Sequence, residues 1–135
     1  MKPDYVIAVL AAGLGTRLKS DRAKVLHRLG GRTMIETVLR AVRPLASKGH
    51  YVIIGHQADE VRAVAEPLGV KTVLQAPQLG TGHALMVARS AIERAAGHAL
   101  VLPGDAPLIT AATLEAFVDF HFHTSSVATI LTARV

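Results

Sequence analysis

Short apolar runs alternate with stretches of helical character along this chain of 135 residues, and this alternation constrains the fold more than any other feature. The first run, Tyr5–Leu10, is continuously apolar, which is typical of a parallel strand covered on both faces. Strands separated by helices predict an α/β fold with a doubly wound, mostly parallel, Rossmann-like sheet and right-handed crossovers.

The remaining elements follow the same pattern. Four more strands are expected at Tyr51–Ile54, Lys71–Gln75, Ala99–Leu102 and Val127–Val135. Four helices are expected from a cap at Thr33 to about Lys48, and at Asp59–Glu66, Thr81–Ala96 and Ala111–Phe122. In the first helix, Glu36 follows Thr33 at the spacing of a capping box. Because the chain stops at the fifth strand, we expect a truncated fold, with residues 1–135 forming part of one domain and no second domain.

The charge is unevenly distributed. Residues 1–48 hold ten Lys and Arg against three acidic residues, although the whole chain carries a net charge of only +5. This asymmetry favours an anionic ligand near the N-terminal third, either a small phosphate compound or nucleic acid, and a solvated basic face is the alternative. The absence of Trp and the few aromatic residues argue against a surface that stacks single-stranded nucleic acid.

Composition also excludes several classes of site. The chain has no cysteine, which excludes disulfides, thiolate metal sites and cysteine nucleophiles. No segment reaches the roughly 18 apolar residues that a membrane span requires, and the apolar run Tyr5–Ala12 reads as a strand instead of a signal peptide. We therefore expect a cytoplasmic protein with neither a membrane nor a nucleic-acid partner.

Three glycine-containing segments follow predicted strands: Ala11–Ser20, Leu79–His83 just after Gln75, and Pro103–Pro107. Ligands of open α/β sheets bind at the carboxyl ends of the strands, so all three segments are expected at one edge. Glycines in the first segment would let backbone N–H groups approach phosphate oxygens, although a tight turn is the simpler interpretation. It is neither a Walker A loop nor a complete dinucleotide fingerprint.

Individual side chains in these segments suit a nucleotide site. Asp105, just beyond a strand, could hold Mg²⁺ together with substrate phosphates, or could instead cap the following turn or helix. The amide of Gln75 could pair with a base edge. The seven histidines do not cluster convincingly; His83 is close to the expected site but has no evident partner. No Ser/His/Asp set is recognisable, so covalent catalysis has little support.

The order and spacing of the motifs resemble one family in particular. The segments are Leu10–Leu18, Lys24–His27, Leu74–Ala84 and Gly104–Ile109. The first resembles the signature loop of nucleotide-sugar pyrophosphorylases. With the others, essentially the whole chain is similar to the nucleotidyltransferase domain of the bacterial bifunctional N-acetylglucosamine-1-phosphate uridylyltransferase and glucosamine-1-phosphate acetyltransferase family.

The resemblance implies a role for each motif residue. It implies an enzyme that uses Mg²⁺ to join UTP and N-acetylglucosamine-1-phosphate, giving UDP-N-acetylglucosamine and pyrophosphate for cell-wall precursors. Arg17 and Lys24 would be the catalytic residues that neutralise the triphosphate, and Asp105 would bind the metal. The nucleotide-binding residues would be Leu10, Ala11, Ala12, Gly13, Lys24, Gln75, Gly80, Thr81 and Gly104, with Gln75, Gly80 and Thr81 reading uracil.

The family pattern is incomplete in this chain. Pro103 stands where the family often has an aromatic or polar residue, and the sugar contacts and second metal ligand are expected beyond Val135. The acetyltransferase domain is expected there too, with the contacts of any homo-oligomer. Two alternatives to the uridylyltransferase therefore stay open: a nucleotide-binding fragment without turnover, and a nucleotidyltransferase for another base or sugar phosphate.

Overall fold

The computed structural model describes residues 3–134, and its central element is a parallel sheet in the order β5-β4-β1-β6. The strands are β1 (Tyr5–Ala11), β4 (His50–Ile54), β5 (Lys71–Leu74) and β6 (His98–Pro103). Each pairs in parallel with its neighbours. The chain builds outward from β1 to β5 and then returns to place β6 on the other side of β1. This reversal makes the sheet doubly wound, as predicted.

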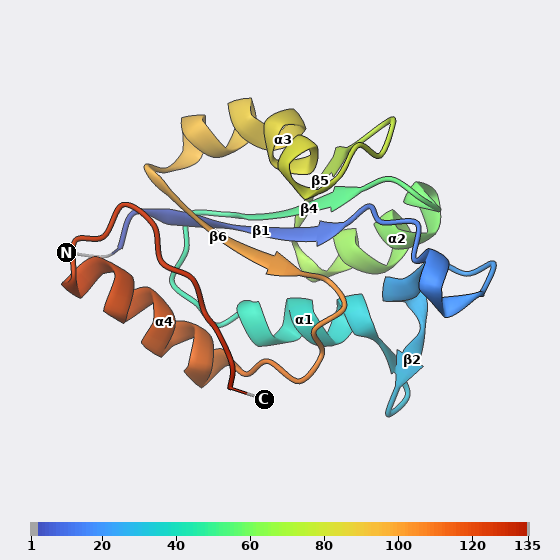
Figure 1. Cartoon of the computed structure of the whole chain (residues 1–135), viewed down its shortest axis with the longest axis horizontal. Coiled ribbons are helices and arrows are strands. Elements are labelled where there is room, and N and C mark those ends of the chain that lie inside the picture. The colour runs from blue at the N-terminus through green and yellow to red at the C-terminus, as the bar shows by residue number, and fades with distance from the viewer. Residues whose placement is uncertain (1–2, 135) are drawn as a thin grey trace.

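Helices cover both faces of the sheet (Figure 1). One face carries α1 (Met34–Val42), α2 (Ala58–Ala65) and α4 (Ala111–His123), and the opposite face carries α3 (Thr81–Ala95). Alternate residues of β1 point to the two layers: Val9 joins the larger apolar cluster and Ala8 the smaller one. The burial of β1 on both faces explains its continuously apolar sequence.

The helix α1 begins as predicted and ends early. Thr33 is its N-cap, and its side-chain oxygen accepts a hydrogen bond from the backbone N–H of Glu36 at 3.2 Å. The Glu36 carboxylate does not complete a capping box but pairs with Arg40 at 3.1 Å. The helix stops at Val42 instead of Lys48, because Pro44 lacks the N–H that a further turn needs and restricts the residue before it.

Two further differences concern segments with weak sequence signals. The basic stretch after β1, for which the sequence predicts no helix or strand, contains two short 3-10 helices and a hairpin: η1 (Thr16–Leu18), η2 (Lys24–Leu26), β2 (Arg28–Leu29) and β3 (Arg32–Thr33). A third 3-10 turn, η3 (Glu66–Leu68), follows α2. The predicted strand Val127–Val135 is wrong for residues 127–134, which form no strand, and Val135 lies outside the described residues.

The failure of the fifth strand has a physical reason. Residues 127–134 run as an extended segment beside α4, and Val127 and Ile130 are largely exposed. A β-branched sequence becomes a strand only where a neighbouring strand accepts its hydrogen bonds. Within residues 3–134, no helix combines the length and hydropathy that crossing a membrane requires.

Candidate functional site

The loops at the carboxyl ends of β1, β5 and β6 surround a pocket of about 620 Å³. It lies where the strand order reverses, next to the boundary between β1 and β6, the usual ligand position in such sheets. Ten of the eleven predicted site residues line it: Leu10, Ala11, Ala12, Gly13, Arg17, Lys24, Gln75, Gly80, Thr81 and Asp105. The structure therefore brings ten of the predicted residues together in one pocket, and the ligand role of each residue stays a prediction.

The eleventh residue, Gly104, lies behind the pocket wall. Its N–H donates to the carbonyl oxygen of Leu10 at 2.8 Å, which continues the pairing of β6 with β1. A Cβ at Gly104 would stand 2.9 Å from that same oxygen and 3.2 Å from side-chain atoms of Ile35 and Val25. Glycine thus permits the close approach that brings the next residue, Asp105, to the pocket.

The first loop folds back onto Lys24 through a second glycine. Gly15 has φ +61°, in the left-handed region that favours glycine, and its Cβ position would lie 3.1 Å from the Cβ of Lys24. The turn starts η1, which carries Arg17 at the rim of the pocket. Ala11 and Ala12 are buried, so this wall offers a ligand chiefly backbone groups.

Lys24 and Asp105 form an ion pair across the pocket. The Lys24 Nζ lies 2.6 Å from the Asp105 Oδ2, and both side chains are partly exposed. Arg17 is exposed and takes part in none of the ion pairs found within residues 3–134. Asp105 does not cap a helix, because the N-cap of α4 is Thr110. The pocket therefore presents one unpaired cation and one cation already matched to a carboxylate.

On the opposite wall, the side chain of Gln75 is held by two acceptors. Gln75 is only 2% exposed, and its Nε2 lies 3.0 Å from the Gly80 carbonyl oxygen and 3.0 Å from the His83 Nδ1. The sequence reasoning found no partner for His83; the structure corrects this. His83 lies in the first turn of α3, eight residues after Gln75, and this spacing across a loop has no periodic signal.

A residue that the sequence reasoning missed holds the basic loop. Gln57, just after β4, has φ +49°, and its Oε1 accepts a hydrogen bond from the Ala23 N–H. Its Nε2 donates to the Asp21 carbonyl oxygen at 2.9 Å. Two backbone groups just before Lys24 are thereby fixed by a side chain 34 and 36 residues away. No local sequence pattern marks this role, because the positive φ and the long-range hydrogen bonds of Gln57 appear only in the structure.

No group of three or more His, Cys, Asp or Glu side chains within residues 3–134 is placed to hold a metal. Asp105 is the carboxylate at the pocket. A Mg²⁺ ion that keeps its waters and binds substrate phosphates needs only one or two protein carboxylates. The donor set is compatible with such an ion and unsuited to a site built from protein ligands alone.

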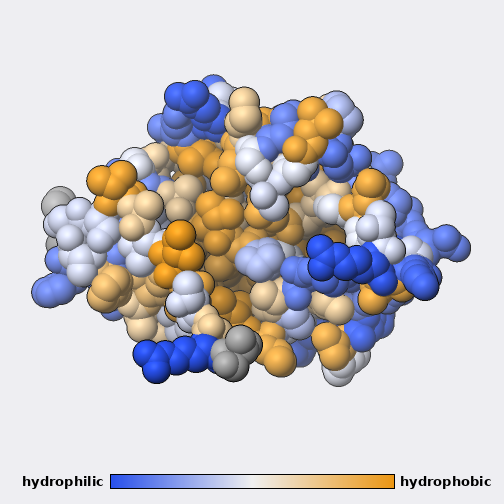
Figure 2. Space-filling view, viewed as in Figure 1, coloured by the Kyte–Doolittle hydropathy of each residue, from blue (hydrophilic) through white to orange (hydrophobic). Residues whose placement is uncertain are grey.

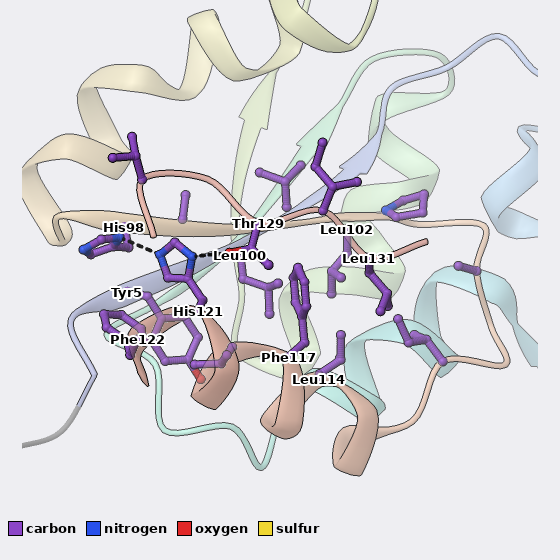
Figure 3. Close-up of a pocket in the computed structure, with 18 of the residues that line it drawn as sticks. Tyr5, His98, Leu100, Leu102, Leu114, Phe117, His121, Phe122, Thr129 and Leu131 are labelled. Atoms are coloured by element: carbon purple, nitrogen blue, oxygen red, sulfur yellow. Dashed lines mark hydrogen bonds between the residues drawn. The ribbon is translucent and has the colours of Figure 1, made fainter. Parts of the chain in front are cut away.

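A second cavity of about 630 Å³ lies beside β6, α4 and the segment 127–131 (Figure 3). Its labelled side chains are mostly apolar, among them Leu100, Leu114 and Phe117. The exception is a chain of hydrogen-bonding side chains at one end: His121 lies 3.1 Å from His98 and 2.8 Å from Thr129. The space-filling view shows hydrophobic surface in the middle of this face (Figure 2). None of the charged residues predicted for the nucleotide site, Arg17, Lys24 and Asp105, lines this cavity.

The geometry agrees with comparisons to known proteins. Over 130 residues the chain is 48% identical to the bifunctional protein GlmU of Streptococcus pyogenes serotype M12 (strain MGAS2096), covering 96% of this chain and 31% of that protein. The chain thus spans about a third of the length of that relative.

Two solved structures share the fold. A nucleotidyl transferase from Methanothermobacter thermautotroptrophicus, Mth528, has 30% identity and a TM-score of 0.69, over 87% of this chain and 58% of that one. Rv0371c from Mycobacterium tuberculosis H37Rv, in complex with manganese, has 25% identity and a TM-score of 0.71, over 87% and 59%. The sequence model of the MobA-like NTP transferase domain matches residues 7–134. The chain therefore belongs to the family of MobA-like NTP transferase domains.

Proposed function

We propose that this chain is the nucleotide-binding part of a Mg²⁺-dependent uridylyltransferase that joins UTP and N-acetylglucosamine-1-phosphate. One observation carries the proposal: the signature loop, Gln75 with Gly80 and Thr81, and Asp105 line a single pocket at the carboxyl edge of the sheet. The family membership and the 48% identity to the protein GlmU support the same substrates. The cytoplasmic location expected from the sequence stays a prediction.

The phosphate end of the nucleotide would lie near the two cations. Arg17 is exposed at the rim, and Lys24 projects from the loop that Gly15 folds back. A triphosphate would compete with Asp105 for the Lys24 ammonium, since both are anionic oxygen ligands. The small residues Ala11, Ala12 and Gly13 leave the loop backbone open to the nucleoside, with its N–H and C=O groups as the polar contacts.

Asp105 would hold the metal ion, for which its single carboxylate suits a hydrated ion shared with phosphates. The manganese complex of Rv0371c, which has 25% identity to this chain, supports the use of a divalent ion in the family. When bound, the ion supplies positive charge that stabilises the negative charge of the reacting phosphates. Release of Lys24 from Asp105 on metal binding would leave its charge available to the nucleotide.

The transfer itself needs little covalent work from the protein. A phosphate oxygen of the sugar phosphate attacks the α-phosphorus of UTP in line, the bond to the β-phosphate oxygen breaks, and pyrophosphate leaves with both electrons. Arg17 and Lys24 would stabilise the charge on the phosphates, and the loop backbone would orient the nucleoside. The pocket, which offers cations and backbone but no nucleophile–base pair, suits this chemistry.

The second candidate function is nucleotide binding without turnover. This candidate requires only the residues that line the nucleotide pocket and none that would contact a sugar phosphate. The third, another base or sugar phosphate, keeps the same phosphate site and changes only the specificity. All three share the prediction that a nucleoside triphosphate binds with Mg²⁺.

Calorimetry with UTP and Mg²⁺ and a pyrophosphate-release assay with N-acetylglucosamine-1-phosphate, on the same sample, separate these candidates. Binding with turnover supports the uridylyltransferase. Binding without turnover supports the second candidate, a chain that binds the nucleotide and catalyses no transfer. Titrations with CTP, GTP and dTTP identify the base. Failure to bind any of the four triphosphates in the presence of Mg²⁺ would contradict all three candidates.

A further inference from the structure

The orientation of the Gln75 amide is determined by its neighbours. The Gly80 carbonyl oxygen, 3.0 Å away, can only accept a hydrogen bond, so the amide atom beside it is the NH₂ nitrogen. The same nitrogen lies 3.0 Å from the His83 Nδ1. Its second hydrogen therefore goes to His83, which accepts at Nδ1 and carries its own proton on Nε2.

This arrangement uses both hydrogens of the amide and leaves its oxygen, Oε1, without a hydrogen-bond donor. No hydrogen bond within residues 3–134 goes to the Gln75 Oε1, although the side chain is 2% exposed and lines the nucleotide pocket. The backbone of Gln75 is fixed as well, since its N–H donates to Ile54 at 2.7 Å and its carbonyl accepts from Gln78 at 3.1 Å. The pocket wall thus offers one rigidly held acceptor.

A rigid acceptor distinguishes the pyrimidine bases. The ring nitrogen N3 of uracil carries a hydrogen between two carbonyl groups, whereas N3 of cytosine is a bare acceptor. Uracil can donate N3–H to Oε1, while the N3 lone pair of cytosine would face the oxygen without a proton. Sites built to pair with one donor reject ligands that lack it, because the buried polar group then stays unpaired.

We propose that His83 is a positioning residue that fixes the Gln75 amide with Oε1 toward the base, and so makes the pocket prefer UTP to CTP. This inference rests on the proposed function, and it deepens it by naming the residue that sets the base preference. His83 acts through Gln75 and need not touch the nucleotide. Gly80 alone would hold one of the two amide hydrogens and leave the other, in a buried side chain, without an acceptor.

The test compares two substitutions. His83→Leu removes the acceptor, and His83→Asn keeps one, because an Asn Oδ1 occupies about the position of a His Nδ1. Calorimetry with UTP and with CTP, each with Mg²⁺, gives the ratio of the two dissociation constants. We expect the preference for UTP to fall at least about tenfold in His83→Leu, since leaving a buried donor unpaired costs enough for such a factor. His83→Asn should retain most of it, and His123→Leu, on the exposed end of α4, should match the unmodified chain.

The outcomes separate this inference from the proposed function. An unmodified chain that prefers UTP, with a folded His83→Leu variant that keeps the same preference, would overturn the role of His83 and leave the function intact. Failure of the unmodified chain to bind UTP would overturn both. Nitrogen-15 NMR of the free chain gives a readout that needs no ligand: His83 should carry its proton on Nε2, and a proton on Nδ1 would contradict the inference even where variants misfold.

Discussion

The two cavities that meet at the end of β6 have similar volumes, about 620 and 630 Å³, and opposite chemistry. Pro103 lines both. On one side, three loops present charged groups, backbone and a fixed amide; on the other, a sheet edge and α4 present mostly apolar side chains (Figure 3). Cavity size therefore does not distinguish the two cavities, whereas polar groups that converge from separate strand ends favour the first as the proposed ligand site.

Residues of the two cavities should also differ in whether their substitution affects ligand binding or stability. Residues of the proposed nucleotide pocket are mostly partly exposed loop residues, so changing them should alter binding more than folding. Residues under the apolar cavity belong to the core cluster, so changing them should do the reverse. Four predictions, in order of the effect expected, test this division.

The largest effect is expected at Asp105. Asp105→Asn removes the proposed metal carboxylate and leaves Lys24 without its partner. A metal contributes several kcal/mol of charge stabilisation, and about 1.4 kcal/mol corresponds to a factor of ten in rate, so UTP-dependent pyrophosphate release should fall at least about a hundredfold. Calorimetry should show a matching loss of Mg²⁺-dependent UTP binding. Asp59→Asn, in an exposed pair with Arg62, is the control. A folded Asp105→Asn protein that binds UTP with Mg²⁺ normally would refute the metal assignment.

Leu114 should show the opposite behaviour. It is fully buried, at 0% exposure, beneath the apolar cavity. Leu114→Ala should lower the free energy of unfolding by about 2–5 kcal/mol, measured by urea denaturation, because it leaves a void in packed core. At temperatures where the variant is folded, its affinity for UTP should stay within about twofold of the unmodified chain. A large loss of affinity without loss of stability would erase the distinction between the two cavities.

Two glycines near the proposed nucleotide pocket should also differ in whether their substitution affects stability or UTP binding. A Cβ at Gly104 meets the Leu10 carbonyl oxygen at 2.9 Å, whereas a Cβ at Gly13 meets no atom within 4 Å. Gly104→Ala should therefore destabilise the fold by about 1–3 kcal/mol. Gly13→Ala should change stability by less than about 0.5 kcal/mol and instead weaken UTP binding. Equal stability losses, measured by thermal unfolding, would contradict the packing argument; unchanged UTP binding in Gly13→Ala would remove Gly13 from the site.

The smallest effect comes from His50, at the amino end of β4 and away from both cavities. Burial lowers the pKa of His50 below its ordinary 6.5, and a hydrogen bond to the Val42 backbone, which raises the pKa, partly offsets this. Above pH 6.5 the imidazole is neutral in folded and unfolded chains alike. As the pH falls from there through the lower pKa of the folded state, the unfolded chain binds the proton more readily, so stability decreases.

Urea unfolding from pH 8 to pH 5 measures this effect. His50→Gln should lose less stability on acidification than the unmodified chain, while His123→Gln should keep the original pH dependence. The result also sharpens the comparison, since any pH effect on folding that survives in His50→Gln must come from another group. An unchanged pH dependence in His50→Gln would show that burial of this imidazole does not contribute to the pH dependence of stability.

Much of this fold could be predicted from local patterns. The strands near Tyr5 and Tyr51 were found because parallel strands buried on both faces are continuously apolar. The segment Val127–Val135 is also rich in β-branched residues but forms no strand within residues 127–134, because composition does not supply a hydrogen-bonding neighbour. The predicted end of α1 near Lys48 is wrong, because Pro44 stops the helix at Val42.

The grouping of the predicted site residues at one edge could be predicted from sequence, but their contacts with one another could not. Strand ends place Gln75 and Asp105 at one edge by topology alone. The pairing of Asp105 with Lys24, and of Gln75 with His83, depends on side-chain conformations at contacts between loops. Such contacts have no periodic signal, so the sequence predicts neither the partner of His83 nor the contacts of Gln57.

The hydrogen bonds of Gln57 have a consequence for how tightly the chain would bind a nucleotide. By holding the backbone at Asp21 and Ala23 from the loop between β4 and α2, this one amide keeps the segment before Lys24 in place when no ligand is bound. A loop that is ordered beforehand loses little conformational entropy when a nucleotide arrives. Affinity in this pocket would then depend on a residue that does not line it. Substitution of Gln57 would weaken binding without altering any group that contacts the nucleotide.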